Sequence, residues 1–222
     1  MRMPNIAAQT LQRQILSGAY QPGQMLPGQR VLAGSLGISR ASLREALSML
    51  ETLGFIRAVP GKGTLVTAGR SVGQSTATQS SAEVLATYQL RFVLEPAAAA
   101  LAARAVEAQL TPRLWGAQTR FEESLKTLDL IGASRADLEF HQLIADLSGN
   151  AVFLQIVRSF EDRISHSLSL PLADHDRLWE AALEHRAIAA AISAGDAEGA
   201  RHAMQAHLLG TAQRVGITFV PP

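Results

Sequence analysis

The sequence of 222 residues contains no cysteine. Disulfide bonds, thiolate metal sites and cysteine nucleophiles are therefore excluded, and nothing argues for an oxidising compartment. No window approaches the roughly eighteen uninterrupted apolar residues of a membrane-spanning helix, and the N-terminus lacks the apolar core of a signal peptide. These absences predict a soluble, cytoplasmic protein.

The net charge is also small, at +1, but it is unevenly distributed. Residues 1–70 contain eight Lys or Arg and two Asp or Glu, about +6, whereas residues 71–222 contain twelve and seventeen, about −5. A basic N-terminal part favours a polyanionic partner, because cationic side chains that meet phosphates release condensed counterions. Nucleic acid is therefore the first partner to consider.

A connector separates two parts of different character. Residues 69–81, GRSVGQSTATQSS, have almost no large apolar side chains and are rich in Ser, Thr, Gly and Gln, which is typical of a flexible linker. We predict an N-terminal domain over residues 1–68 and a C-terminal domain over residues 82–222. Long Ala- and Leu-rich segments with helical periodicity predict that the second domain is an all-α antiparallel helical bundle.

The segment from Gln29 to Ala46, QRVLAGSLGISRASLREA, matches a helix-turn-helix. Gly37 stands where the chain needs a positive φ to turn between two crossed helices. Ser39 is a suitable N-cap for the second helix. The positions expected to be buried carry apolar residues, namely Leu32, Ala33, Leu36, Ile38, Leu43 and Ala46.

A β-hairpin pattern follows this helix. Residues 55–59, FIRAV, and 64–66, TLV, flank the tip PGKG at 60–63. Gly61 and Gly63 leave room for a sugar-phosphate backbone, and Lys62 supplies a positive charge. The N-terminal domain is therefore predicted to be a winged helix-turn-helix, helical with a small β-hairpin wing.

Arg40, Ser42 and Arg44 stand at the exposed start of the second helix, the end normally offered to the major groove. A single exposed arginine is usually an ordinary solvated charge. Here two basic residues coincide with a cap, a turn glycine and a wing, which favours binding to double-stranded DNA. Arginine contacts phosphates at least as often as guanine, so no base is assigned to either residue.

Three histidines and one aspartate have a spacing that suggests a metal site. Asp137 and His141 are four residues apart and project from one face of a helix. His185 and His207 are equidistant from a turn signal at residues 195–196, so in an antiparallel helical hairpin they lie side by side, each about 16 Å from the bend. If both helices face the first one, three imidazoles and a carboxylate converge.

Such a set can bind Zn²⁺ or another first-row divalent ion such as Ni²⁺, Mn²⁺ or Fe²⁺. The alternative is that each histidine is a hydrogen-bonded residue of the core, which is the usual state of a lone buried histidine. The sequence does not decide between these two interpretations by spacing alone.

Three further polar residues are candidate effector ligands. Arg91 and Glu95 are four residues apart, so Arg91 either forms an intrahelical salt bridge or points into the bundle to clamp a carboxylate. Asn150 follows a glycine and is most simply the cap of the next helix, with a pocket role second. Arg163 is predicted to be a charge at the surface or at a pocket rim.

With these residues in place, the chain resembles the GntR family of regulators, in the branch whose sensing domain is called FCD. The N-terminal resemblance rests on ILSGAYQPGQMLPGQRVLAGSLGISRASLREALSMLETLGFI followed by PGKGTLV. In the C-terminal part it rests on RFVLEPAAAALAARA, DLEFHQLIADLSGN and EHRAIAAAISAGDAEGARHAMQAHL. These long, ordered motifs cover nearly the whole chain.

The resemblance implies a transcriptional regulator, a repressor, that binds a short palindromic operator as a homodimer. It implies that Arg30, Arg40 and Arg44 contact DNA together with Gly61 of the wing. The family usually has acidic residues on both sides of the Arg30 position, where this chain has Gln29 and Val31, so the orientation of Arg30 is in doubt.

The resemblance also implies a metal site and an effector. It places Asp137, His141, His185 and His207 at the metal positions of the FCD bundle. Members with this set commonly sense small organic or sugar acids, whose carboxylate completes the metal shell. The acyl-CoA-sensing members do not use this set. Whether the effector releases the protein from DNA or promotes binding stays open.

Two alternatives of other classes remain. A metal-dependent hydrolase fused to a DNA-binding domain is conceivable, because three histidines and an aspartate with an open position can activate water. Against the hydrolase, no additional acid or base residue stands at a recognisable spacing from the four candidate metal ligands. In the other alternative, the metal has only a structural role: it holds the helices together, and the ligand site is vestigial. A di-iron oxygenase is disfavoured because it needs two Glu-x-x-His motifs, which the sequence lacks.

Overall fold

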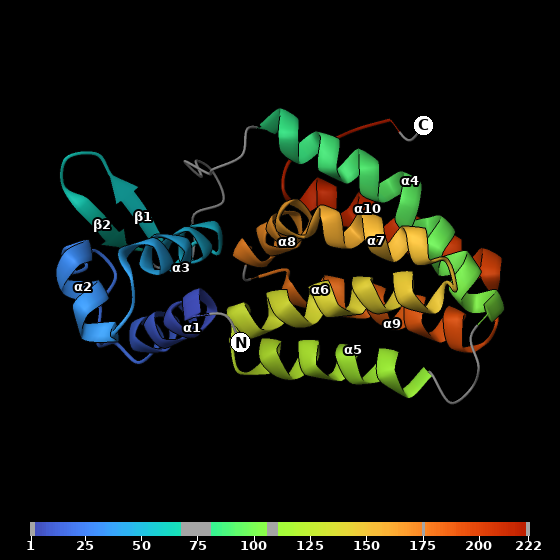
Figure 1. Cartoon of the computed structure of the whole chain (residues 1–222), viewed down its shortest axis with the longest axis horizontal. Helices are drawn as coiled ribbons and strands as arrows, with labels where there is room; N and C mark the ends of the chain where they lie inside the picture. Colours follow the sequence, from blue (N-terminus) through green and yellow to red (C-terminus); the bar gives the residue numbers. More distant parts are fainter. Residues whose placement is uncertain (1–2, 68–80, 106–110, 175, 221–222) are drawn as a thin grey trace.

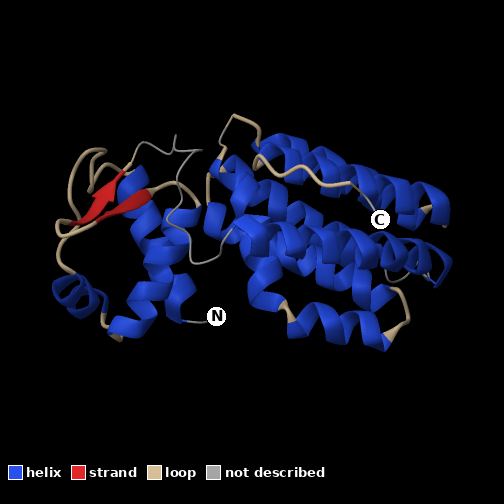
Figure 2. Ribbon diagram, turned by 90° about the horizontal axis from the view of Figure 1, so that it is seen from above, coloured by secondary structure: helices blue, strands red, loops and turns tan. Residues whose placement is uncertain are grey.

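The computed structural model describes residues 3–67, 81–105, 111–174 and 176–220. A two-stranded hairpin and three helices form one end of the molecule, and a bundle of helices forms the rest (Figures 1 and 2). Among these residues, none of the helices is both long and apolar enough to span a membrane. The predicted fold class, mostly α with a winged helix-turn-helix and a helical bundle, is confirmed. Except for Ser81, the predicted linker lies outside the described residues, and the predicted domain limits stay a prediction.

The N-terminal part follows the predicted order of elements. These are α1 (Met3–Leu16), α2 (Gln29–Leu36), α3 (Arg40–Thr52), β1 (Ile56–Val59) and β2 (Gly63–Val66). Gly37 ends α2 with a φ of 65°, a conformation that costs a glycine little. Ser39 begins α3, because its side chain accepts a hydrogen bond of 3.1 Å from the backbone N–H of Ser42.

The apolar positions of the helix-turn-helix pack as a small core. Leu32, Ala33, Leu43 and Ala46 are buried, whereas Leu36 and Ile38 are half-buried and pack against the same core. The burial predicted for those two residues is therefore only partial.

The wing is an antiparallel hairpin in which Ile56 pairs with Val66 and Val59 pairs with Gly63. At the tip, Gly61 has a φ of 73°. Gly63 has a φ of 119°, and a side chain there would meet the methyl group of Met25 at 3.2 Å. Only glycine fits both requirements at this position.

The C-terminal part is a helical bundle, as Figure 2 shows. Its elements are α4 (Ser81–Ala105), α5 (Thr111–Lys126), α6 (Leu130–Leu147), α7 (Ala151–Ser159), α8 (Glu161–Ser169), the 3₁₀ helix η1 (Leu170–Ala173), α9 (Leu178–Ser193) and α10 (Ala197–Arg214). Helix α4 packs on α6 and α10, α5 packs on α6 and α9, and α9 packs on α10. Between them lies a core of small and large apolar side chains that includes Phe92, Phe140, Ile188, Met204 and Leu208.

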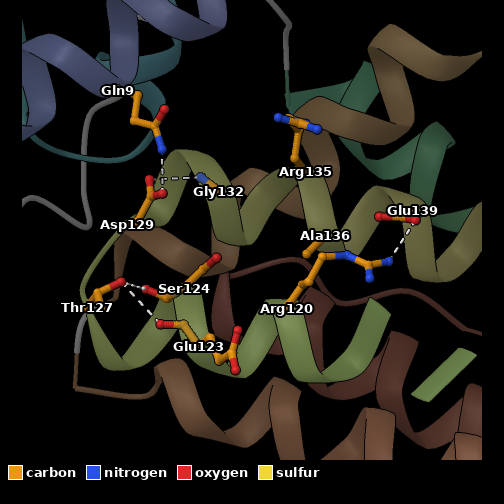
Figure 3. Close-up of a pocket in the computed structure, with 10 residues that line it drawn as sticks. All are labelled: Gln9, Arg120, Glu123, Ser124, Thr127, Asp129, Gly132, Arg135, Ala136 and Glu139. Carbon is orange, nitrogen blue, oxygen red and sulfur yellow. Dashed lines mark hydrogen bonds and ion pairs between the residues drawn. The ribbon is translucent and has the colours of Figure 1, made fainter. Parts of the chain in front are cut away.

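The two parts are joined by a continuous apolar core and by a polar contact. Leu11 of α1 belongs to the same buried cluster as Leu130 and Ile131 at the start of α6. Figure 3 shows Gln9 of α1 pointing at Asp129, which it reaches with a hydrogen bond of 2.6 Å. Asp129 in turn caps α6 by accepting from the N–H of Gly132 at 3.0 Å.

A second glutamine of α1 makes a tighter contact. The side chain of Gln12 is almost fully buried, donates to the carbonyl of Leu128 and accepts from the N–H of Ile131 at 3.2 Å. Leu128 has a φ of 54°, which is unusual for a residue other than glycine. We call the contact of Gln9 and Gln12 with residues 128–132 the α1–α6 junction.

Candidate metal centre and DNA-binding surface

One face of α6 and the α9–α10 hairpin meet in the middle of the bundle. Asp137 and His141 lie one turn apart on α6. Between α9 and α10, Gly195 has a φ of 73°, and Asp196 caps α10 by accepting from the N–H of Gly199 at 2.8 Å. The chain reverses there, which brings the rings of His185 and His207 to 4.7 Å between centroids.

The structure brings all four predicted metal ligands together. The ring of His141 lies 5.4 Å from that of His185 and 5.3 Å from that of His207, and one nitrogen of each ring lies within 4.8 Å of the others. Oδ1 of Asp137 lies 3.3 Å from Nε2 of His141 and 3.5 Å from Nε2 of His185. We call these four residues the Asp–His cluster.

The cluster contains buried polar atoms that no hydrogen bond satisfies. They include Oδ1 of Asp137, both ring nitrogens of His185 and Nε2 of His207, and each of the four residues is at most 4% exposed. Unsatisfied buried polar atoms are rare in folded proteins, and some of those that occur are the binding atoms for an ion. Imidazole and carboxylate are also the donors that first-row divalent ions accept. The residues present therefore fit a metal ion.

The pKa values of the three histidines in the cluster shift in different directions. Burial, together with the neighbouring cations, lowers the pKa of His185 well below its usual value and keeps that ring neutral, as a metal ligand must be. Burial also lowers the pKa of His207. Burial acts the same way on His141, but Glu95 and Asp137 outweigh it and raise the pKa of that ring.

Arg91 combines the two roles considered for it. It forms the intrahelical salt bridge with Glu95, at 2.7 Å from Nε to Oε1, yet its side chain is only 1% exposed. Its other nitrogens lie 3.2 Å from Oγ of Ser167 and 3.4 Å from Nε2 of His141. Burial opposes ionisation of Glu95, but Arg91 and His141 outweigh it and hold the pKa of Glu95 far below its usual range. Arg91 is thus a buried cation beside the cluster.

Two small cavities adjoin the cluster. A cavity of about 10 Å³ touches Arg91, Asp137 and Ser167, and another of about 10 Å³ touches Glu95 and His141. Each has room for about one water molecule. Neither of these two cavities is large enough for a small acid as it stands.

The other two candidate effector ligands lie elsewhere. Asn150 is exposed and caps α7, where its Oδ1 accepts from the N–H of Val152 at 3.0 Å. Arg163 of α8 is about half exposed and lies 3.8 Å from Glu83 of α4. Neither residue lines either of the two small cavities described above. Their suggested effector roles stay a prediction.

The predicted DNA-contacting side chains share one end of the molecule. Arg40 and Arg44 are exposed at the start of α3, and Arg30 is exposed on α2. Gly61 and Lys62 are exposed at the tip of the wing. Ser42 differs, because it is half-buried and its Oγ lies 3.0 Å from Oγ of the cap Ser39.

Sequence reasoning missed two groups of residues. Glu184 lies 2.8 Å from Nδ1 of His207 and accepts hydrogen bonds from Arg214. Arg214 comes seven residues after His207, which places both side chains on the same face of α10. That spacing is a signal that could have been used. For the α1–α6 junction we find no such signal, because its partners are more than a hundred residues apart.

Comparisons with known proteins agree on the class of protein. The model of the gntR family of bacterial regulatory proteins matches residues 5–66, and that of the FCD domain matches residues 86–210. Fold and site together define a DNA-binding protein of the winged-helix type with a helical second domain. The chain belongs to the GntR family of transcriptional regulators and carries an FCD domain.

Two curated relatives are named as regulators. A protein of Escherichia coli K12, named for regulation of the L-lactate dehydrogenase operon, is 34% identical over 204 residues, which is 85% of this chain and 76% of that protein. LutR of Bacillus subtilis is 29% identical over 215 residues, covering 87% and 92%. These relatives are transcriptional regulators and not enzymes, which sets the hydrolase alternative aside.

Solved structures share the fold. A GntR regulator from Rhodococcus sp. RHA1 has a TM-score of 0.55 and 21% identity, covering 97% of this chain and 99% of that one. McbR/YncC of E. coli has a TM-score of 0.54 and 22% identity, covering 97% and 98%. At this identity the likeness supports the architecture alone.

Proposed function

We propose that the protein is a repressor whose affinity for its operator depends on a small organic or sugar acid bound at a divalent metal in the C-terminal bundle. The observation that carries this proposal is the Asp–His cluster, in which buried donor atoms converge and lack partners. We also propose the division into residues 1–68, which bind DNA, and residues 82–222, which bind the effector and dimerise.

The proposed operator complex is a homodimer on a palindromic site. Each N-terminal part places α3 in the major groove, with Arg40 and Arg44 at its leading end. Arg30 of α2 and the wing tip, Gly61 and Lys62, contact the flanking backbone. The support is that all five residues are exposed and belong to α2, α3 and the wing, which lie together at one end of the molecule (Figure 1).

The metal ligands in this proposal are Asp137, His141, His185 and His207, and Zn²⁺ is the first ion to test, ahead of Ni²⁺, Mn²⁺ and Fe²⁺. When bound, the ion supplies a positive Lewis-acid centre that attracts a carboxylate. Arg91 lies against the same cluster, so its guanidinium adds a second positive charge facing an incoming acid.

Helix α6 connects the cluster with the DNA-binding part. It carries Asp137 and His141, and its first turn forms the α1–α6 junction with Gln9 and Gln12. Helix α1 packs on α3. A shift of α6 on effector binding therefore moves α3 through α1. The effector drives this shift only if it binds the shifted position of α6 more tightly than the original one.

A structural metal is the second candidate, and one observation favours it. The two cavities described beside the cluster are water-sized, so neither has space for an acid. In that case the metal only holds α6, α9 and α10 together.

A thermal-shift experiment separates the two functions. Full-length protein is compared without metal, with zinc, and with zinc plus a panel of acids headed by lactate, because one relative is named for an L-lactate dehydrogenase operon. A further rise in melting temperature with one acid, coupled to a change in operator affinity, supports the sensor. Stabilisation by zinc without any response to acids supports the structural metal.

A further inference from the structure

One histidine of the cluster is held by a carboxylate from the neighbouring helix. Oε2 of Glu184 lies 2.8 Å from Nδ1 of His207, and the two atoms form a hydrogen bond. His207 is 1% exposed, and its other nitrogen, Nε2, faces the cluster without a partner. Glu184 directly precedes His185, so α9 supplies both a member of the cluster and a group that supports another member.

The carboxylate of Glu184 is itself fixed by Arg214. Nη1 of Arg214 donates to Oε1 of Glu184 at 2.8 Å, and Nη2 donates to Oε2 at 2.7 Å, which is a bidentate pair. The side chain of Arg214 is 2% exposed, and Nη1 also donates to Glu180 at 3.0 Å. The carboxylate therefore has little freedom to rotate away from His207.

This arrangement selects one tautomer of His207. A carboxylate accepts a hydrogen bond, so Nδ1 carries the hydrogen and Nε2 keeps its lone pair directed at the cluster. His185 lacks such support, since neither of its ring nitrogens has a hydrogen-bond partner. For His141, Glu95 lies 2.8 Å from Nδ1, but Arg91 competes for the same carboxylate.

We infer that Glu184 and Arg214 are a positioning pair that holds His207 ready to accept a divalent cation at Nε2 and thereby sets the metal affinity of the site. The inference rests on the proposed metal function and adds to it residues that do not touch the ion. Partners of this kind orient a ligand and raise its basicity, and their loss typically weakens metal binding about 10- to 100-fold.

The test must separate positioning from simple stabilisation, because the pair also links α9 to α10. A matched control is Glu122, which binds Arg186 in a bidentate manner between α5 and α9 but touches no histidine. Glu184→Gln and Glu122→Gln each remove a carboxylate from such a pair, and only the first change alters the support of His207.

Two measurements are made on the full-length chain. Zinc affinity is measured by competition with a chromophoric chelator, and the tautomer of His207 in zinc-free protein is read from the ¹⁵N shifts of its ring. We expect the wild type to carry the hydrogen on Nδ1. We expect Glu184→Gln to lose about 10- to 100-fold in zinc affinity, with a mixed tautomer, while Glu122→Gln retains both properties.

Each other outcome has a definite meaning. A wild type that binds none of Zn²⁺, Ni²⁺, Mn²⁺ and Fe²⁺ overturns both this inference and the proposed metal function. A Glu184→Gln variant that binds zinc as tightly as the wild type overturns the positioning pair alone. If Glu184→Gln does not fold, the wild-type spectrum still decides, because a hydrogen on Nε2 of His207 is incompatible with the inference.

Discussion

At the scale of single residues, His185 is the least supported member of the Asp–His cluster. It is fully buried, stacks on Phe140 with ring centroids 4.3 Å apart, and has no hydrogen-bond partner for either nitrogen. Because its removal breaks no hydrogen bond, a variant at this position is the sharpest test of metal binding.

His185→Ala is therefore expected to reduce the zinc content of the protein, because the cluster then keeps only three of its four donors. Metal analysis after dialysis measures the effect. His202→Ala is the control, since His202 lies exposed on the same hairpin outside the cluster. Full zinc occupancy in His185→Ala would remove this residue from the site.

His166 provides a prediction about pH. Burial lowers the pKa of this ring, so the folded protein holds the proton less tightly than the unfolded chain. The stability that follows from the neutral ring is present above the ordinary histidine pKa of about 6.5 and is lost as the pH falls below it.

Urea unfolding of the wild type and of His166→Gln, each at pH 7.5 and pH 5.5, measures this contribution. The wild type should lose more free energy of unfolding on acidification than the variant does. Equal losses in the two proteins would show that His166 does not titrate in this way.

At the scale of elements, α3 and the wing carry the proposed DNA contacts. Arg44→Ala should weaken operator binding by about 1 to 3 kcal/mol if the guanidinium reads a base, without changing the melting temperature. Arg158→Ala, an exposed arginine of α7, is the control for a lost charge. Unchanged operator affinity in Arg44→Ala would take this residue off the DNA-contacting surface.

For the wing, the prediction concerns how DNA affinity depends on salt concentration. Lys62 is exposed at the tip, where it is expected to contact a phosphate. Lys62→Ala should therefore weaken binding to specific and random DNA alike and reduce the slope of log affinity against log salt by about one. Fluorescence anisotropy over a range of salt concentrations measures that slope, and an unaltered slope contradicts the contact.

Sequence alone predicted those elements that local chemistry defines. The turn between α2 and α3 follows from Gly37 and Ser39, and the hairpin follows from the glycines at its tip. The proximity of His185 and His207 follows from the reversal at residues 195–196, because opposite positions of a helical hairpin are fixed by counting from the bend.

What the sequence could not supply depends on packing between distant segments. Arg91 is buried against Ser167 of α8, and no local sequence pattern records a contact between segments so far apart. For Asn150 the structure shows the cap at the start of α7, and the pocket role stays a prediction. The water-sized cavities beside the cluster result from the fit of whole helices.

At the scale of the whole molecule, the α1–α6 junction is the polar link between the cluster and the DNA-binding part. Gln12→Leu should lower the free energy of unfolding by about 1 to 3 kcal/mol, because it leaves the buried N–H of Ile131 without a partner. It should also reduce the effect of an acid on operator affinity.

Gln9→Ala, which leaves the Gln12 contacts in place, should have a smaller effect on both quantities. Urea unfolding and operator titration measure them, and full coupling in Gln12→Leu would exclude the junction from transmission.

In the proposed mechanism, an acid at the Asp–His cluster controls binding to DNA. The most direct measurement is the dissociation constant of the zinc-loaded full-length protein for an operator selected from random DNA, with and without each acid of the panel. We predict that one acid changes this constant by about 5- to 150-fold in the wild type and not in His185→Ala. A constant that no acid changes, or an equal change in His185→Ala, would contradict the mechanism.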